Sequence, residues 1–170
     1  MIFMSQSGLL NAEKEAEWDE WYVEHLRIML TVDGINDAQR FKTRDEGHPP
    51  SLAMYSLTSA AVFEDPYYQK IRGMGPWLPL IDRRFYRRNL FEGMASLPEV
   101  PEGESLWVVD RDRADLVLPG VNFSWLKCVG IDLSTQYRGL AVMPLDHNVG
   151  PAREAGVAIY LPSGIEHHAC

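Results

Sequence analysis

Three side chains in the first forty residues carry groups that suit acid/base chemistry: His25, Tyr22 and Arg40. An imidazole takes up and releases protons near neutral pH, which makes His25 a candidate general base. Tyr22 lies one helical turn before His25, so its phenol can orient the same ligand. Arg40 offers a fixed positive charge where negative charge develops on an enolate, phenolate or carboxylate. Together they point to removal of a proton next to a carbonyl or a phenol.

The same residues have structural alternatives. A histidine among aromatic residues also occurs in ordinary cores, and an arginine on a strand also pairs with carboxylates of a neighbouring helix. The sequence leaves both alternatives open. The choice depends on whether the three side chains converge.

Aromatic residues supply the predicted substrate-binding set. Trp18 and Trp21 share a helical stripe with Tyr22 and His25, at a spacing of 3.6 residues per turn. Tyr86 and Trp125 lie on predicted strands, and His147 follows Asp146 in a loop. Such residues suit a small, largely aromatic metabolite, although aromatic residues at these positions also serve as core. The expected binding residues are therefore Trp18, Trp21, Tyr86, Trp125 and His147.

The elements that must position these residues alternate between strand and helix over residues 1–93. Alternating patterns predict strands at 2–8, 36–43, 52–57 and 83–91. A helix at 12–30 begins after Asn11, and a second begins near Ser59, with a kink or restart expected at Pro66. This β-α-β-β-α-β order predicts a ferredoxin-like half with two helices on one face of an antiparallel sheet.

The rest of the chain reads as mostly strand. Residues 94–104 carry two prolines, one glycine and three glutamates and form a predicted linker. Strands are expected at 106–110, 123–132, 136–143 and 157–161, with a short helix near 151–155. A weak internal repeat links Asp33-Gly34-Ile35-Asn36 to Pro119-Gly120-Val121-Asn122. Residues 105–170 thus form a β-rich, degenerate second half that packs with the first as one compact unit.

The run Trp21-Tyr22-Val23-Glu24-His25-Leu26, followed by Asp33-Gly34 and then Arg40-Phe41, resembles the EthD-like group of the dimeric α+β barrel superfamily. The resemblance covers residues 1–93 and implies an α+β fold in which two sheets face each other as a barrel. It also implies that the first-helix histidine faces a pocket between sheet and helices. Members include muconolactone isomerases, polyketide cyclases, cofactor-free monooxygenases and haem-using enzymes, so the resemblance leaves the reaction open.

Composition and the absence of known motifs argue against several classes of function. A net charge of −8 argues against nucleic-acid binding, and the absence of a long apolar run or signal pattern predicts a cytoplasmic protein without membrane spans. The chain has no nucleophile elbow, phosphate loop, dinucleotide fingerprint or cupin histidine pattern. The tail, with His167, His168 and Cys170, resembles a metal cluster in composition only. We therefore expect no metal and no cofactor.

The leading hypothesis is a cofactor-independent lyase, isomerase or cyclase that acts on a small aromatic substrate through His25. The alternatives are a haem or oxygen-using monooxygenase and a non-catalytic small-ligand-binding barrel. A homodimer is expected, although one chain could suffice if the second half completes the barrel. A cavity of a few hundred Å³ that reaches His25 would favour an enzyme, and a filled interior would favour the non-catalytic alternative.

Overall fold

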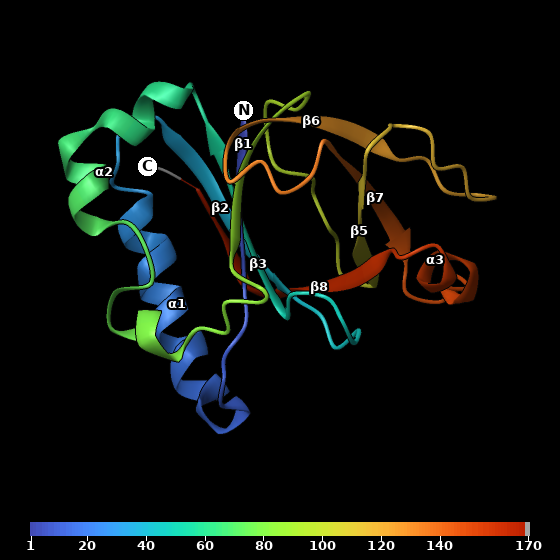
Figure 1. The fold of residues 1–170 in the computed structure, drawn as a ribbon, viewed down its shortest axis with the longest axis horizontal. Coiled ribbons are helices and arrows are strands. Elements are labelled where there is room, and N and C mark those ends of the chain that lie inside the picture. The colour runs from blue at the N-terminus through green and yellow to red at the C-terminus, as the bar shows by residue number, and fades with distance from the viewer. Residues whose placement is uncertain (169–170) are drawn as a thin grey trace.

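Eight antiparallel strands close into one barrel in the computed structural model, which describes residues 1–168 (Figure 1). The order around the barrel is β1-β3-β2-β8-β5-β7-β6-β4. The strands are β1 (Ile2–Ser7), β2 (Ile35–Lys42), β3 (Ser51–Leu57), β4 (Arg87–Glu92), β5 (Glu104–Arg111), β6 (Ser124–Ile131), β7 (Tyr137–Pro144) and β8 (Ala158–His168).

Two seams join the halves of the chain. The N-terminal strands are ordered β4-β1-β3-β2, and the strands after residue 104 repeat this order as β8-β5-β7-β6. β2 then pairs with β8, and β4 pairs with β6. Closure leaves no open sheet edge within the barrel, so the backbone groups of β2 and β4 are paired on both sides.

The predicted fold class is wrong. An α+β dimeric barrel with a ferredoxin-like half and a degenerate second half was expected, whereas the structure is mostly strand and one chain closes an eight-stranded antiparallel β-barrel. Periodicity identifies strands but carries no signal for which distant edges pair, and the β2–β8 and β4–β6 seams decide the class. The argument for a second chain as the cover of a bare sheet therefore does not apply. The homodimer itself stays a prediction, as does the division at 94–104.

The barrel interior is filled by side chains. Residues alternate along each strand, so Ile2 and Met4 of β1 point inward while Phe3 points outward. Met54, Leu106 and Tyr160 complete the packing from other strands, and each is fully buried. The interior is therefore a core and offers no large ligand cavity among the described residues.

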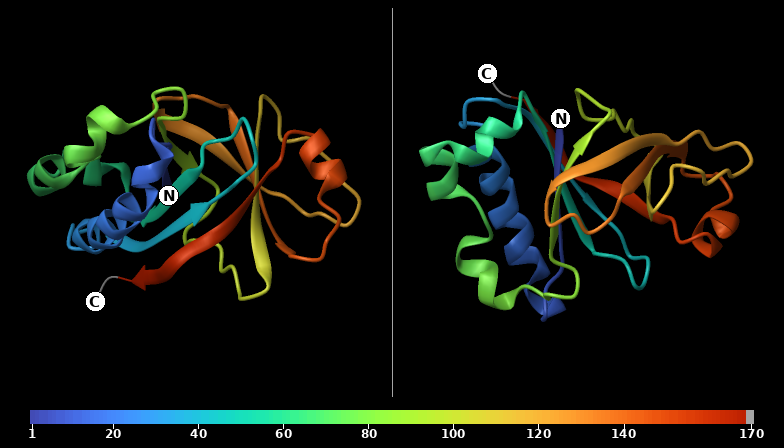
Figure 2. Two further views of the ribbon diagram at one scale, coloured as in Figure 1. Left: turned by 90° about the horizontal axis from the view of Figure 1, so that it is seen from below. Right: turned by 45° about the horizontal axis from the view of Figure 1, so that its top comes forward.

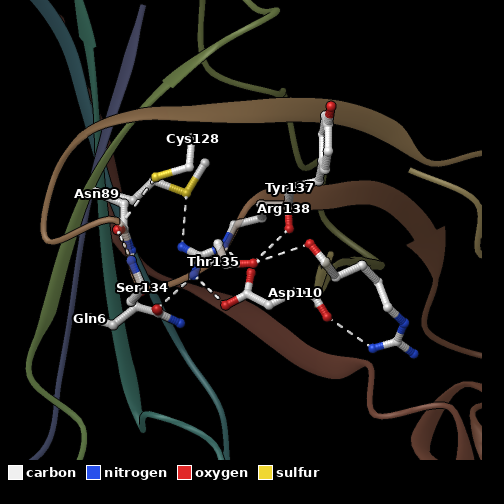
Figure 3. Close-up of polar contacts among 10 residues, drawn as sticks. Gln6, Asn89, Asp110, Cys128, Ser134, Thr135, Tyr137 and Arg138 are labelled. Atoms are coloured by element: carbon white, nitrogen blue, oxygen red, sulfur yellow. Dashed lines mark hydrogen bonds and ion pairs between the residues drawn. The ribbon is translucent and has the colours of Figure 1, made fainter. Parts of the chain in front are cut away.

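The interior also contains one fully buried arginine, Arg138 of β7 (Figure 3). Its Nε and Nη2 donate to the two carboxylate oxygens of Asp110, at 2.7 and 2.8 Å, and Nη2 also donates to Oε1 of Gln6 at 2.7 Å. The guanidinium lies over the Phe91 ring, 5.0 Å from its centroid. The buried charge is thus paired and hydrogen-bonded, as burial of a charge requires.

The helices lie outside the barrel on two opposite sides (Figures 1 and 2). On one side α1 (Glu15–Met29) and α2 (Pro66–Ile71) lie together, with the short 3-10 helices η1 (Ala12–Lys14), η2 (Ala60–Glu64) and η3 (Gly75–Leu80). The other side is covered by α3 (Gly150–Glu154) and by the β5–β6 connection. We call α1, α2 and the side chains packed between them and the sheet the helical layer.

Local sequence explains the helices of this layer. The Asn11 side chain caps η1, and α1 buries Trp18, Tyr22, His25 and Met29 at spacings of three and four residues. The restart expected at Pro66 is confirmed: η2 ends at Glu64, and Asp65 caps α2 by accepting from the Tyr68 N–H at 2.8 Å. Within residues 1–168, no helix combines the length and apolar character needed to cross a bilayer.

Candidate functional site

His25 lies in the helical layer with its ring held between two aromatic side chains. It is only 9% exposed, stacks on Trp21 at 4.5 Å between centroids, and meets the Tyr22 ring edge-on at 5.8 Å. Among the described side chains it has no hydrogen-bond or ion-pair partner. Burial lowers the pKa of His25 to about 4, so the imidazole is neutral at physiological pH.

The His25 ring faces a small cavity between β1, β3 and the helices. Its volume is about 30 Å³, which is room for roughly one water molecule. Phenols and guanidinium groups dominate the polar lining. The lining includes Ser5, Tyr22, His25, Tyr55, Tyr68, Arg72, Met74, Tyr86 and Arg88.

Tyr22 separates this cavity from Arg40. The Arg40 guanidinium lies over the Tyr22 ring, 4.0 Å from its centroid, and over Trp18 at 4.6 Å. Burial raises the pKa of the Tyr22 hydroxyl, and the positive charge of Arg40 opposes that rise. The phenol is therefore protonated at neutral pH and can donate a hydrogen bond.

Arg40 is engaged with its own partners outside the His25 cavity. Its Nη1 donates to Asp19 of α1 at 2.7 Å and its Nε donates to the Ser51 hydroxyl at 2.8 Å. It lines a different space, a groove of about 280 Å³ that α1 shares with Ser163 and Gly164 of β8. The structure therefore brings Tyr22 together with both His25 and Arg40, but it does not place Arg40 on the cavity that His25 faces.

The remaining predicted residues divide between two sides of the barrel. Trp18 is buried, Trp21 is half-buried against His25, and Tyr86 lines the His25 cavity. Trp125 packs against Phe123 in the cluster covered by α3, and His147 meets Trp107 edge-on at 5.4 Å. Since this cluster lies on the opposite outer face from α1, Trp125 and His147 cannot join a site at His25 (Figure 1).

Several cavity residues were not identified from the sequence. Tyr55 reaches the cavity from β3, Tyr68 and Arg72 from α2 and its end, and Met74 from the loop that follows. Arg88 had a usable signal, because it alternates onto the same face of its strand as Tyr86. Tyr68, Arg72 and Met74 reach the site through the packing of α2 and the loop after it on the sheet, which local patterns do not report.

The residues present do not form an evident metal or haem site. No group of three or more potential metal ligands gathers among the residues that the structure describes. Cys170 of the predicted tail cluster lies outside the described residues, as do the side chains of His167 and His168. A porphyrin does not fit the space of about 30 Å³ beside His25, whose ring is already covered by Trp21.

Comparisons of the chain with protein-family models, with curated proteins and with solved structures gave no match. The resemblance to the EthD-like group therefore stays a prediction, as does the cytoplasmic location.

Proposed function

We propose that the protein is a cofactor-independent acid/base enzyme, a lyase or isomerase, that acts on a small aromatic metabolite at the His25 cavity. One observation carries the proposal: a neutral imidazole without a hydrogen-bond partner faces a cavity lined by four tyrosines and two arginines. The imidazole nitrogens have no partner among the described residues, so they are free to bond a ligand in the cavity, and titratable groups with shifted pKa values concentrate at functional sites.

The lining defines the roles in such a reaction. His25 accepts a proton from a C–H or O–H group next to a carbonyl or aromatic ring, and later returns it to another atom of the same substrate. Arg72 and Arg88 provide positive charge while the substrate is an enolate or phenolate. Tyr22 and Tyr86 donate hydrogen bonds that orient it. Arg40 acts indirectly, as a positioning residue that holds the Tyr22 ring.

A non-catalytic ligand-binding barrel is the second candidate, and the cavity volume favours it. About 30 Å³ is far below the space that a one-ring ligand needs, and the barrel interior is filled. Turnover therefore requires the cavity to widen. Met74 is the side chain placed for this movement, because it contacts the Tyr22 hydroxyl through sulfur at 4.0 Å and lies between Gly73 and Gly75, both at positive φ.

Enzyme-catalysed incorporation of deuterium into a bound ligand distinguishes the enzyme from the non-catalytic barrel, and the product need not be known. Aromatic carbonyl compounds and phenols that raise the melting temperature are incubated with the protein in D2O, and ligand deuteration is followed by NMR. We expect exchange that falls at least about a hundredfold in His25→Gln and persists in His48→Gln, a matched change in a loop. Binding without exchange in the wild type would instead establish the non-catalytic barrel.

A further inference from the structure

A second, open pocket adjoins the His25 cavity and shares part of its wall. Its volume is about 240 Å³, and it lies outside α2 at the β4–β6 seam. Phe3, Tyr68, Arg72 and Arg88 line both spaces, so these four side chains form the wall that the two spaces share. We call this space the outer pocket.

The outer pocket contains two arginines, of which, among the described residues, one is paired with a carboxylate and the other is not. Arg88 forms an ion pair with Asp132, with Nη2 at 3.3 Å from Oδ1, and its backbone N–H donates to the same carboxylate at 2.8 Å. Arg72 forms no ion pair with any described carboxylate. The Nε of Arg88 is buried and lacks a hydrogen-bond partner. A ligand with a single negative charge would complement this arrangement.

The rest of the wall is aromatic and apolar. Phe3 meets Phe63 edge-on at 5.4 Å, and Phe63 meets Tyr68 in the same way at 5.4 Å, which forms a continuous ring-lined surface. Such surfaces bind a flat aromatic ring by stacking and edge contacts. The volume lies just below the usual range for small-molecule sites, so the pocket suits a compound with no more than one ring.

Backbone strain marks the same place. Ile131 has φ +68°, a conformation that β-branched residues rarely adopt, and its side chain is 41% exposed at the pocket. The residue after it is Asp132, which holds Arg88. The strained turn thus presents an apolar side chain at the pocket rim and fixes one of the two arginines, which is the kind of arrangement that functional sites retain.

We propose that the outer pocket binds an aromatic monocarboxylate, with its carboxylate on Arg72 and Arg88 and its ring on Phe3, Phe63 and Tyr68, and that it is the entrance to the His25 cavity. The entrance part rests on the proposed function, because it assigns the ligand's far end to His25. The binding part stands without catalysis. It depends only on the charges and the aromatic wall of the outer pocket.

Benzoate is the probe, and benzamide is its neutral counterpart of the same shape. Binding is measured by NMR chemical-shift titration at low and high salt. We expect benzoate to bind at least about tenfold more tightly than benzamide, and Arg72→Gln and Arg88→Gln each to weaken benzoate about tenfold, since hydrogen bonds to charged groups have this magnitude. Arg87→Gln is the matched control, because Arg87 carries the same charge on the same strand but does not line the pocket.

Three results would overturn the assignment: no benzoate binding, equal affinity for benzamide, or an equal loss in Arg87→Gln. Circular dichroism of Arg88→Gln checks that its fold is intact, and Arg72→Gln tests the exposed arginine independently. His25→Gln distinguishes the two proposals. If it keeps benzoate affinity and loses exchange, both stand, whereas unchanged exchange refutes only the catalytic role of His25.

Discussion

The barrel interior and the helical layer differ in whether their buried polar groups have hydrogen-bond partners. In the interior, the nitrogens of Arg138 are directed at Asp110, Gln6 and the Met4 sulfur, and the Tyr160 hydroxyl donates to the Pro49 carbonyl at 2.7 Å. Among the described residues, four buried side-chain atoms lack a partner. These atoms are Ser7 Oγ, Trp18 Nε1, Arg40 Nη2 and Arg88 Nε.

All four unpaired atoms belong to residues that face the helical layer. Trp18 lies on α1, Arg40 packs on Tyr22 of α1, Arg88 lines the His25 cavity, and Ser7 lies near the Tyr22 hydroxyl without a hydrogen bond of normal geometry. An unsatisfied buried group costs free energy, and such departures from full pairing are expected at functional or strained sites. The interior maintains the fold, and the helical layer is where a ligand would find unpaired donors.

The largest effect is expected from breaking the interior network. Asp110→Ala leaves the fully buried Arg138 charge without its carboxylate, and removal of one partner of a buried pair is strongly destabilising. We expect a loss of about 3 kcal/mol in the free energy of unfolding, at the low end of the range because Asp110 is 38% exposed. Urea denaturation measures it.

The double variant Asp110→Leu/Arg138→Met is the control for this loss. Removing both charges leaves neither buried alone, so the double variant should be more stable than Asp110→Ala. If Asp110→Ala loses less than about 1 kcal/mol, the interior network does not have the structural role assigned to it.

The second effect is a pH dependence that belongs to the helical layer. The pKa of His25 is about 4 in the folded protein, against 6.5 for an unperturbed histidine. Between these values the unfolded chain binds a proton that the folded chain does not, so the free energy of unfolding falls as pH drops from 6.5 to 4. The contribution is at most about 3 kcal/mol.

Denaturation curves across this pH range should be flatter for His25→Gln than for the wild type. His48→Gln makes the same chemical change in the loop between β2 and β3 and should retain the wild-type slope. Equal slopes for wild type and His25→Gln would mean that the imidazole is not held neutral by the fold.

The smallest effect compares two buried serines. Ser7 is fully buried and its hydroxyl has no partner, whereas Ser105 donates to the Met143 carbonyl at 3.2 Å and accepts from Trp107 Nε1 at 3.0 Å. Ser7→Ala should be neutral or stabilising, and Ser105→Ala should cost about 1 to 2 kcal/mol. Thermal denaturation of the two variants side by side gives the comparison, and a destabilised Ser7→Ala would show that its hydroxyl is paired.

Local elements were predictable because their signals are local. The long helix was expected at 12–30 and occupies Ala12–Lys14 and Glu15–Met29, and the strand expected at 52–57 is Ser51–Leu57. Closure of the barrel was not predictable, because it depends on pairs such as Lys42 with Leu161 whose partners share no sequence signal. The candidate site was likewise predictable only in part. The contact between Tyr22 and His25 follows from their spacing on one helix, whereas Arg72 reaches the His25 cavity through tertiary packing alone.

The path of β8 has a consequence for how the chain folds. This strand pairs with β5 through Ala158–Tyr160 and then with β2 from Leu161 onward, and the nearby Ile159 N–H donates to Asp45, 114 residues earlier. The barrel cannot close until β8 is in place, so the chain must form its longest-range strand pairing to complete the sheet. During synthesis β2 lacks its β8 partner until residues 158–168 have been made, so its unpaired edge is open to pairing with other chains.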